Sequence, residues 1–596
     1  MKKVFKSPIF WGIIAVLLVV VPQLNLYQFI GTDCIHIGVL EGLWDYPGMG
    51  PFTLYQFADG NPRRMSEIIS RGFFPWFTSP DHKVSFCRHL PSALIALNHK
   101  ICGLKPLGYT IHNLLWYIAL ISILGLLVRR IVPAWHGKFS HPVIYLTLII
   151  FAFSTSHLLI VFYGSARWLL IATTLALAGL LAHLKWREQG WKPGKYLSLI
   201  AFFLSLLSGE AALAVLAYLA AYELFGSREP VKNRIKALMP TALLVFVYLI
   251  FYRLMEYGTG GQDSYINPLT DPVSFITALP TRLASMLAEM FSRIISVLGI
   301  DPNLPAMGGV TILAGAAALV ICALLFYPVW SNASIDQRRK TRWLIIGSTA
   351  AMFPLSSGYP CPRVAMIPFI GGSVVLAFIL HHWWHKLSQK RNIRQNLKSP
   401  FAWIGGLMVI VLFFLHLLLS PYYWFADAQE FKKYLDNREE FNRKCTVLNE
   451  FLPHQEAIFL NASKSIYLRD EVYFYRKINR LPLPGAWWEL SCSHHEHRYR
   501  RTGEDKLELE LIGGGMFDHY PYLSVMRSSK TPLKIGEVIK LSGLQITILE
   551  VNENGPTRME FKFDRSLDDE RYLFLKFQDG TLHTIPPPSI GQSITL

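Results

Sequence analysis

Long apolar stretches separated by short polar loops recur along the first 420 residues of the chain. Most of them approach the ~20 apolar residues that a membrane-spanning helix needs. We therefore predict a mainly α-helical, polytopic membrane bundle of about eleven transmembrane helices. The predicted spans are residues 8–30, 107–128, 141–160, 165–184, 196–209, 210–225, 237–254, 308–329, 343–356, 364–384 and 402–420.

The charged residues between these stretches predict the orientation. Lysine and arginine gather in five loops, and with about eleven spans all of these loops fall on the side of the N-terminus. The N-terminus is then cytoplasmic, as expected for an integral multi-pass protein of a bacterial inner membrane. The apolar segment 277–300 carries Arg282 and Glu289, so we expect an interfacial helix on the outer surface. The basic loops are 129–138, 185–195, 228–236, 338–342 and 386–398.

Composition agrees with this class of protein. The chain has 596 residues, of which 52% are hydrophobic and 17% charged, and its formal net charge is +17. On a soluble protein such a charge would indicate nucleic-acid binding, but here the basic residues lie where the positive-inside rule expects them. We therefore expect membrane lipid among the partners and no nucleic acid.

The last part of the chain has a different pattern. Charged residues are frequent there, and apolar and polar residues alternate in 507–511 and 559–563, which is typical of half-buried β-strands. We predict a transmembrane domain at 1–420, with a first extracytoplasmic loop at 31–106. A small, mostly β extracytoplasmic domain follows at 421–596, and it is large enough to fold alone.

Polar residues directly after the first span are the first candidates for chemistry. A carboxylate just outside the bilayer can accept a proton from an acceptor hydroxyl or orient it, and Asp33 is the main catalytic candidate. His36 lies three residues on and would share a helical face with Asp33 in a positioning role. Glu41 and Asp45 are further acidic candidates. The alternative is that these residues only end the span and cap the next turn.

Arginines near the predicted outer surface are the second set of candidates. Arg88, Arg167 and Arg363 could bind a lipid phosphate, because a guanidinium keeps its charge and binds phosphate with two parallel hydrogen bonds. Arg253 and Glu210 could contact substrate, since an acid at membrane depth is a functional candidate. The alternatives are arginines that only reach the interface from apolar surroundings, and a Glu210 that only pairs with one of them.

No metal site is predicted. The seven cysteines form no motif, so that either a disulfide or buried thiols are possible. The run 492–497 contains cysteine and histidine, but without the usual ligand spacing, and a solvated loop is the better interpretation. We expect no cofactor, and a requirement for a divalent ion stays open.

Three stretches resemble a known family. Residues 88–94 (Arg-His-Leu-Pro-Ser-Ala-Leu), 103–115 (Gly-Leu-Lys-Pro-Leu-Gly-Tyr-Thr-Ile-His-Asn-Leu-Leu) and 206–212 (Leu-Leu-Ser-Gly-Glu-Ala-Ala) resemble segments of GT-C membrane glycosyltransferases. Among these, the protein O-mannosyltransferase-like and tetratricopeptide-bearing transmembrane members are the most similar. The resemblance covers roughly residues 1–385, the membrane part. In this chain Gly209 stands where those relatives have a lysine, and Thr32 precedes Asp33 where many have a second acid.

The resemblance implies a function. Such enzymes take a hexosyl or pentosyl group from a polyprenyl-phosphate-linked donor, with an acid in the first outer loop as catalyst, here Asp33. The acceptor would be a hydroxyl on a glycan, lipid or protein, and Arg88 and Arg363 would hold the phosphate. One alternative is a lipid or glycan transporter or flippase, which predicts discontinuous helices in matching halves. Another is a non-catalytic scaffold that retains the GT-C fold.

Overall fold

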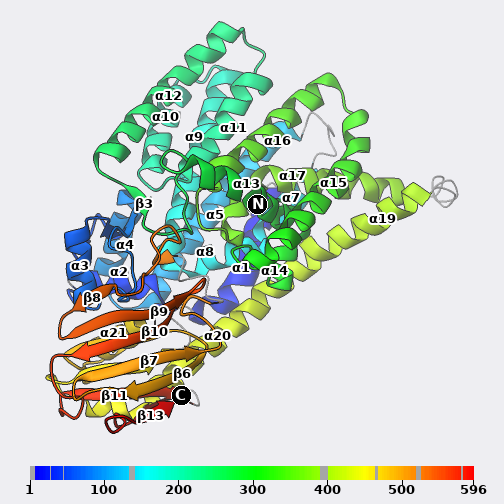
Figure 1. The fold of residues 1–596 in the computed structure, drawn as a ribbon. Coiled ribbons are helices and arrows are strands. Elements are labelled where there is room, and N and C mark those ends of the chain that lie inside the picture. Colours follow the sequence, from blue (N-terminus) through cyan, green and yellow to red (C-terminus); the bar gives the residue numbers. More distant parts are fainter. Residues whose placement is uncertain are drawn as a thin grey trace.

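The computed structural model describes residues 7–26, 28–44, 46–132, 141–388, 400–462, 468–518, 525–578 and 581–596. The candidate Asp45 and most basic residues of the predicted loop 386–398 lie outside these ranges. Helices form one large body, and the strands of the C-terminal part gather at one end of it (Figure 1).

The helical body contains the predicted membrane part. Its elements are α1 (Pro8–Val20), η1 (Val21–Leu26), α5 (Pro106–Ile131), α7 (His141–Ala152), η3 (Thr155–His157), α8 (Leu158–Phe162), η4 (Gly164–Ala166), α9 (Arg167–Gln189), α10 (Pro193–Leu206), α11 (Ala212–Ala221), η5 (Tyr222–Gly226), α12 (Val231–Leu254), α13 (Pro272–Ser292), α14 (Ile294–Leu298), η6 (Pro305–Met307), α15 (Gly308–Ser331), α16 (Ile335–Leu355), η7 (Pro362–Met366), α17 (Phe369–Ser388), α19 (Pro400–Phe413), η8 (Phe414–Leu419) and α20 (Ser420–Lys444).

A helix lies at each predicted span. Among the described residues, five helical stretches are long and apolar enough to cross a membrane, or six if α7 and α8, bent by 52°, form one span. The chain is therefore an integral membrane protein, and the count of eleven spans stays a prediction. The five stretches are Pro106–Ile131, Gly164–Gln189, Val231–Leu254, Gly308–Ser331 and Trp403–Asn442.

Four of the five basic loops meet at one end of the bundle. Arg130, at the end of α5, pairs with Glu188 of α9 at 2.6 Å. Arg228, just before α12, pairs with Asp336 of α16 at 2.5 Å. Lys340 donates a hydrogen bond to the backbone oxygen of Arg130 at 3.4 Å. These loops lie on the same side of the bundle, as the parity of the spans predicts, and that this side is cytoplasmic stays a prediction.

The segment predicted as an interfacial helix forms α13 and α14, and its part from Arg282 onward packs against the bundle. A Cβ atom on Gly315 of α15 would lie 2.4 Å from the backbone oxygen of Ala284, so the two helices touch at that glycine. Arg282 and Glu289 are buried, and Arg282 donates to the backbone oxygen of Ser356 at 2.6 Å. These charged side chains find partners within the bundle, and among the described residues the segment is not one of the stretches long and apolar enough to cross a membrane. Its position at the outer membrane surface stays a prediction.

The first loop folds into short elements that lie between the bundle and the C-terminal strands (Figure 1). A small antiparallel sheet joins it to the segment that follows α12, in the order β1-β2-β3. The elements are α2 (Thr32–Leu40), β1 (Gln56–Asp59), α3 (Pro62–Ser70), β2 (Lys83–Ser85), α4 (His89–Cys102) and β3 (Gly258–Gly260).

The C-terminal part is rich in β-strands, as the alternating pattern predicts, and it contains two sheets. Six antiparallel strands are ordered β13-β6-β7-β10-β9-β8, and four strands are ordered β12-β11-β4-β5 with β4 parallel to both neighbours. The elements are η9 (Thr446–Glu450), β4 (Glu456–Asn461), α21 (Leu468–Ile478), β5 (Ala486–Glu489), β6 (Glu496–Arg501), β7 (Lys506–Ile512), β8 (Val538–Leu541), β9 (Leu544–Asn552), β10 (Gly555–Phe563), β11 (Tyr572–Gln578), β12 (Thr581–Thr584) and β13 (Ser593–Thr595).

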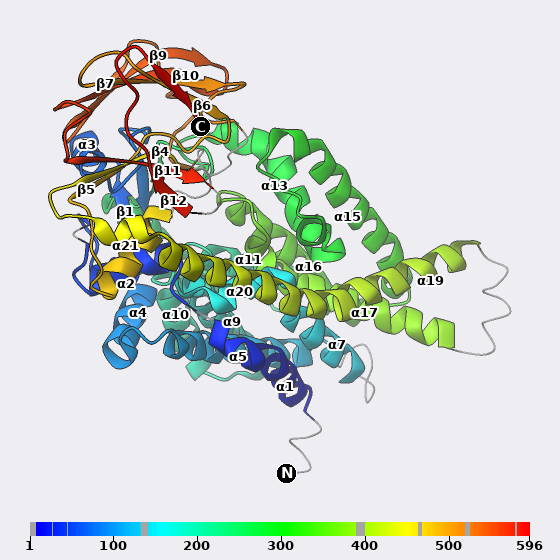
Figure 2. The same ribbon diagram turned by 90° about the horizontal axis from the view of Figure 1, so that it is seen from below.

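A single helix joins the bundle to this β-rich part. The stretch Trp403–Asn442 is helical throughout, and both views show α19 and α20 as one long rod that ends beside the strands (Figure 2). The predicted boundary between residues 420 and 421 therefore falls inside a helix. An apolar helix can continue into a polar one without a break, because the hydrogen bonds of a helix join backbone groups and do not depend on whether the side chains are apolar or polar.

The core of the β-rich part includes residues of the first loop. Trp76 and Phe77 are buried in the same apolar cluster as Leu507, Leu509 and other strand residues. The indole Nε1 of Trp76 donates to the backbone oxygen of Leu490 at 3.1 Å. We therefore expect the terminal domain to depend on the loop for part of its stability.

Replacing Trp76 tests this shared core. Trp76→Ala should lower the free energy of unfolding of the terminal domain by about 3–5 kcal/mol, because it removes a buried indole and leaves a cavity. Limited proteolysis of the full chain in detergent should then cut between residues 445 and 596 much faster than in the wild type. Trp191→Ala is the control, since that ring is 39% exposed. Equal resistance of the Trp76→Ala protein would contradict a shared core.

The orientation can be tested with single cysteines in a cysteine-free variant. Ser331 is exposed at the end of α15, beside the basic loops, and Ser529 is exposed in the terminal domain. A membrane-impermeant maleimide added to intact cells should label Ser529→Cys once the outer membrane is opened and leave Ser331→Cys unlabelled. Labelling of both positions, or of Ser331→Cys alone, would refute the predicted orientation.

Candidate functional site

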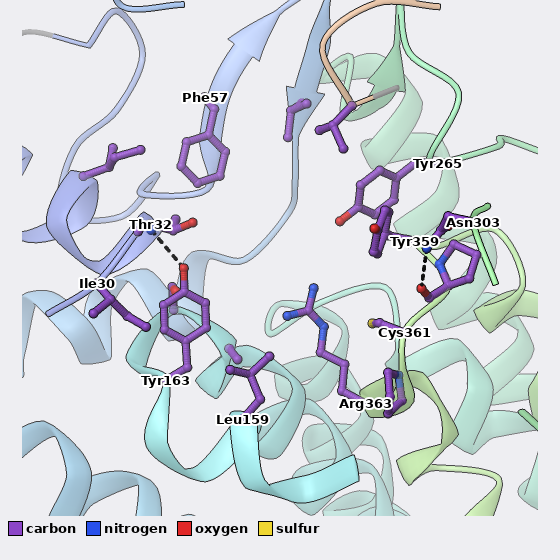
Figure 3. A pocket seen from close by; sticks show the side chains of 18 of the residues that line it. Ile30, Thr32, Phe57, Leu159, Tyr163, Tyr265, Asn303, Tyr359, Cys361 and Arg363 are labelled. Carbon is purple, nitrogen blue, oxygen red and sulfur yellow. Dashed lines mark hydrogen bonds between the residues drawn. The ribbon is translucent and has the colours of Figure 1, made fainter. Parts of the chain in front are cut away.

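A cavity of about 850 Å³ lies where the bundle, the first loop and the C-terminal part meet. Figure 3 shows side chains from all along the chain pointing into it, among them Phe57 of the first loop and Tyr163, Tyr265 and Arg363 of the helical body. The lining segments lie within residues 30–35, 46–88, 155–168, 295–303, 359–363, 427–489 and 525–526, together with residue 265.

The floor of the cavity is built where the helix breaks between α8 and α9. Residues 164–166 form a single turn, whose backbone N–H groups need partners outside the helix. Asp33 supplies them: its Oδ1 accepts from the Ser165 N–H at 2.6 Å, and its Oδ2 accepts from the Gly164 N–H at 3.2 Å. Next to it, the Thr32 N–H donates to the Tyr163 hydroxyl at 2.9 Å (Figure 3).

Asp33 itself lies behind the floor. Its side chain is 4% exposed and does not line the cavity, although its neighbours Thr32 and Ser165 do. Both carboxylate oxygens accept backbone hydrogen bonds, which is the arrangement of a structural cap. The catalytic role predicted for Asp33 stays a prediction, and the observed contacts correspond to the structural alternative.

His36 and Glu41 support the first loop without lining the cavity. The His36 ring is 1% exposed, stacks on Phe57 at 5.7 Å and meets Tyr55 edge-on at 4.7 Å. Burial, with a smaller effect from a nearby arginine, lowers the pKa of His36 to about 3, so its ring is neutral at physiological pH. Glu41, at the end of α2, pairs with His99 of α4 at 3.1 Å.

Arg88 reaches the cavity, and Glu210 reaches Arg88. The Arg88 guanidinium lies 3.7 Å from the ring centre of Trp168 and 4.0 Å from that of Phe86. Its Nη2 lies 3.4 Å from the Glu210 carboxylate, which also accepts from the Tyr252 hydroxyl at 3.2 Å. Glu210 does not line the cavity, and its contact with Arg88 corresponds to the alternative role of arginine partner; a contact with substrate stays a prediction.

Gly209 stands where the GT-C enzymes that the sequence resembles have a lysine, and its surroundings leave no room for a side chain. Its φ is +149°, and a Cβ atom there would lie 2.7 Å from the Trp168 ring. A lysine at this position would therefore displace Trp168 from Arg88. The glycine allows the indole to cover the guanidinium, an arrangement that stabilises a cation by contact with the ring face.

Two of the predicted arginines lie outside the cavity lining. Arg167 is 0% exposed and donates to the Asn98 side chain at 2.6 Å and the Tyr109 backbone oxygen at 3.0 Å, so it joins α9 to α4 and α5. Arg253 is exposed at the end of α12. The candidate residues therefore divide into cavity-lining, supporting and outlying positions, with Arg88 and Arg363 in the lining.

Arg363 is the predicted residue that points most plainly into the cavity. It follows Pro362, which occupies the first turn of η7, where a missing N–H costs no hydrogen bond. Figure 3 shows its guanidinium extending toward the middle of the cavity, with Tyr163 on one side and Tyr359 and Cys361 on the other. A guanidinium in this position can bind an oxyanion inside the cavity with parallel hydrogen bonds.

The wall made by the C-terminal part was missed from the sequence. It brings an acidic set to the cavity: Asp427, Asp470, Glu471 and Glu489, with Tyr434 beside them. One signal was available, since Asp427 and Tyr434 are seven residues apart and so share a face of a helix. Nothing in the sequence indicated that this face would meet the first loop.

A buried carboxylate fixes this wall in place. Glu471 of α21 is 5% exposed, accepts from the Gly31 N–H at 2.7 Å and from the Tyr434 hydroxyl at 2.7 Å, and lies 3.5 Å from Arg438. Arg438 of α20 in turn donates to the backbone oxygen of Phe29 at 2.8 Å. These bonds join α20 and α21 to the chain that leads from the first span into α2.

Among the described residues we find neither a group of side chains placed to hold a metal ion nor a disulfide. No group of three or more histidine, cysteine or acidic side chains there is placed to hold a metal ion. All seven cysteines are unpaired thiols, of which Cys361 lines the cavity. A divalent ion requirement is not tested by this arrangement.

Comparisons with known proteins give distant structural likenesses. No protein-family model and no curated protein matches the sequence. The solved Archaeoglobus fulgidus oligosaccharyltransferase is 12% identical, with a TM-score of 0.38, and the match covers 80% of this chain and 64% of that chain. ArnT from Cupriavidus metallidurans, bound to undecaprenyl phosphate, is 10% identical with a TM-score of 0.38, over 80% of this chain and 89% of that chain.

A third similar structure is the mycobacterial arabinofuranosyltransferase AftD, 12% identical with a TM-score of 0.30 over 93% of this chain and 41% of that chain. All three are of the class that the sequence resembles, the GT-C glycosyltransferases. Because these identities and TM-scores are low, they carry no weight for the activity of this chain.

The cap that Asp33 provides can be tested by Asp33→Asn. The amide keeps the shape, but its NH2 group replaces one of the two acceptor oxygens, so one of the two backbone N–H groups loses its partner. We expect stability to fall by about 1–3 kcal/mol, seen as a lower midpoint of thermal unfolding in detergent. Glu41→Gln, which alters a partly exposed pair, should change it much less. An unchanged midpoint for Asp33→Asn would leave the cap without energetic importance.

Proposed function

We propose that the protein is a glycosyltransferase that works in this cavity. It takes a sugar from a polyprenyl-phosphate-linked donor and transfers it to a hydroxyl of an extracytoplasmic acceptor. The observation that carries the proposal is the placement of Arg363 and Arg88 in one cavity between a membrane bundle and an outer domain. A lipid-linked substrate needs such a place, because its tail stays in the bilayer while its head group reacts outside it.

The donor phosphate is assigned to Arg363. The negative charge on the phosphate grows as the bond to the sugar breaks, and a charged hydrogen-bond donor favours that state. Arg88 lies on the same cavity but shares its charge with Glu210 and is covered by aromatic rings. It is therefore suited to set the shape and charge of the site, while Arg363 makes the direct contact.

The rest of the cavity suits a sugar. A volume of about 850 Å³ is within the usual size of small-molecule sites, ~300–1,000 Å³. Tyr265 and Tyr359 supply aromatic faces, and Asn303 and the acidic wall supply hydrogen-bonding groups for hydroxyls. The acceptor would enter beside the C-terminal part, which would exclude water and contribute to acceptor choice.

The alternatives receive less support. A transporter of the inverted-repeat kind would have broken helices in matching halves, whereas one bent helix pair that could form a span is found among the described residues. A non-catalytic scaffold would not need an arginine directed into an open cavity. The transfer assay below separates the scaffold from the enzyme.

Donor binding tests the role of Arg363. Arg363→Ala should raise the Kd for undecaprenyl phosphate at least about tenfold in detergent, because a hydrogen bond to a charged group contributes ~1.5–3 kcal/mol. Arg363→Lys should recover part of the loss through charge alone. Arg253→Ala is the matched control, since it removes an exposed arginine outside the cavity lining.

Sugar transfer tests the function itself. Purified protein in liposomes is given polyprenyl-phosphate glucose, mannose and arabinose, each labelled in the sugar, together with membranes of a strain that lacks the protein. Transfer of one label into the membranes by the wild type, reduced in Arg363→Ala and retained in Arg253→Ala, is expected. Equal Kd values in all variants, or no transfer with any donor, would refute the proposal.

A further inference from the structure

Five carboxylates line the cavity, and four of them have partners. Asp301 accepts from the backbone N–H of Asn303 at 2.9 Å and from its side chain at 2.7 Å. Glu471 holds the α2 junction, and Asp470 and Glu489 are engaged in interactions of their own. Asp427 is different: no hydrogen bond or ion pair to its carboxylate exists among the residues that the structure describes.

The position of Asp427 is fixed by the helix that carries it. One turn before it, Trp424 is 1% exposed and its Nε1 donates to the backbone oxygens of Phe153 and Ser154 at 3.1 and 3.2 Å. Two turns after it, Tyr434 lies on the same face and donates to Glu471. α20 is therefore anchored on both sides of Asp427, and the carboxylate is held at the cavity without being used by the fold.

We infer that Asp427 is the general base of the transfer reaction, accepting the proton of the acceptor hydroxyl. This inference rests on the proposed function and adds a catalytic residue from the last helix, outside the first loop. A base needs an accessible lone pair within reach of the acceptor. Asp427 lines the cavity, with no hydrogen bond to its carboxylate among the described residues, whereas both oxygens of Asp33 accept backbone hydrogen bonds behind the floor.

The step is a single displacement. The acceptor O–H bond breaks as its proton passes to a carboxylate oxygen of Asp427, and the acceptor oxygen forms a bond to the anomeric carbon of the sugar. The bond from that carbon to the phosphate oxygen breaks at the same time, on the opposite face. The electron pair leaves with the polyprenyl phosphate, whose charge Arg363 stabilises, and Asp427 later releases the proton to water.

The test separates catalysis from donor binding. Asp427→Asn should lower kcat for sugar transfer by about 10²–10⁴-fold, since base catalysis typically contributes that much. Its Kd for undecaprenyl phosphate should stay within about twofold of the wild type, because an Asn of equal size leaves Arg363 in place. Asp436→Asn, an exposed aspartate farther along the same helix, is the control and should transfer at the wild-type rate.

Chemical rescue distinguishes a base from a structural acid. In Asp427→Ala the deleted carboxylate leaves space in the cavity, and added formate should restore transfer at least tenfold without changing donor affinity. Protection of Cys361 from maleimide by undecaprenyl phosphate reports that the cavity is still folded, since this thiol lines it. Loss of transfer together with loss of this protection, and no effect of formate, would overturn the assignment.

The outcomes also separate the two proposals. A wild type that transfers sugar together with an Asp427→Asn protein that transfers within about threefold of it would overturn the base assignment and leave the proposed function intact. A wild type that transfers no sugar from any donor would overturn the function and this step together. In that case binding of undecaprenyl phosphate would show whether Arg363 still holds a lipid phosphate.

Discussion

The hydrogen bonds of Glu471 hold together the parts that make the cavity. This buried carboxylate joins α21 to the Gly31 N–H at the start of α2 and to Tyr434 of α20. Gly31 has φ +46° and ψ −121°, a conformation that side chains disfavour, so the chain turns sharply where it leaves the first span. Without this contact the acidic wall would have no fixed place opposite the first loop, and α2 would lose a support for its first turn.

The charged residues in and around the cavity have two different roles. Arg88 pairs with the partly exposed Glu210, and removing one partner would leave the other charge without its counterion. Asp33 and Arg167 likewise use their hydrogen bonds to hold backbone and helices together. Arg363 and Asp427 line the cavity from two different helical elements. In the proposed reaction one acts on the leaving phosphate and the other on the incoming hydroxyl.

The C-terminal part is more than an appended domain. Its helix continues from the membrane bundle, and its apolar core includes Trp76 and Phe77 from the first loop. Movement of this part relative to the loop would expose both rings, which would cost hydrophobic stabilisation. The cavity between them is therefore built into the folded structure, with one wall supplied by the C-terminal part.

The sequence by itself determined the class of protein and the local elements. Apolar stretches, basic loops and strand alternation depend on neighbouring residues, so the helices and the β-rich end were predicted, along with Arg88 and Arg363 at the cavity. Tertiary structure decided what each polar residue does. Asp33 caps a turn through Ser165, and Arg167 joins helices through Asn98, so each role depends on a partner 60 or more residues away. The place of Asp427 at the cavity likewise depends on distant segments of the chain. Hydrogen bonding between such distant groups leaves no period or spacing in the sequence, because it is set only when the helices pack.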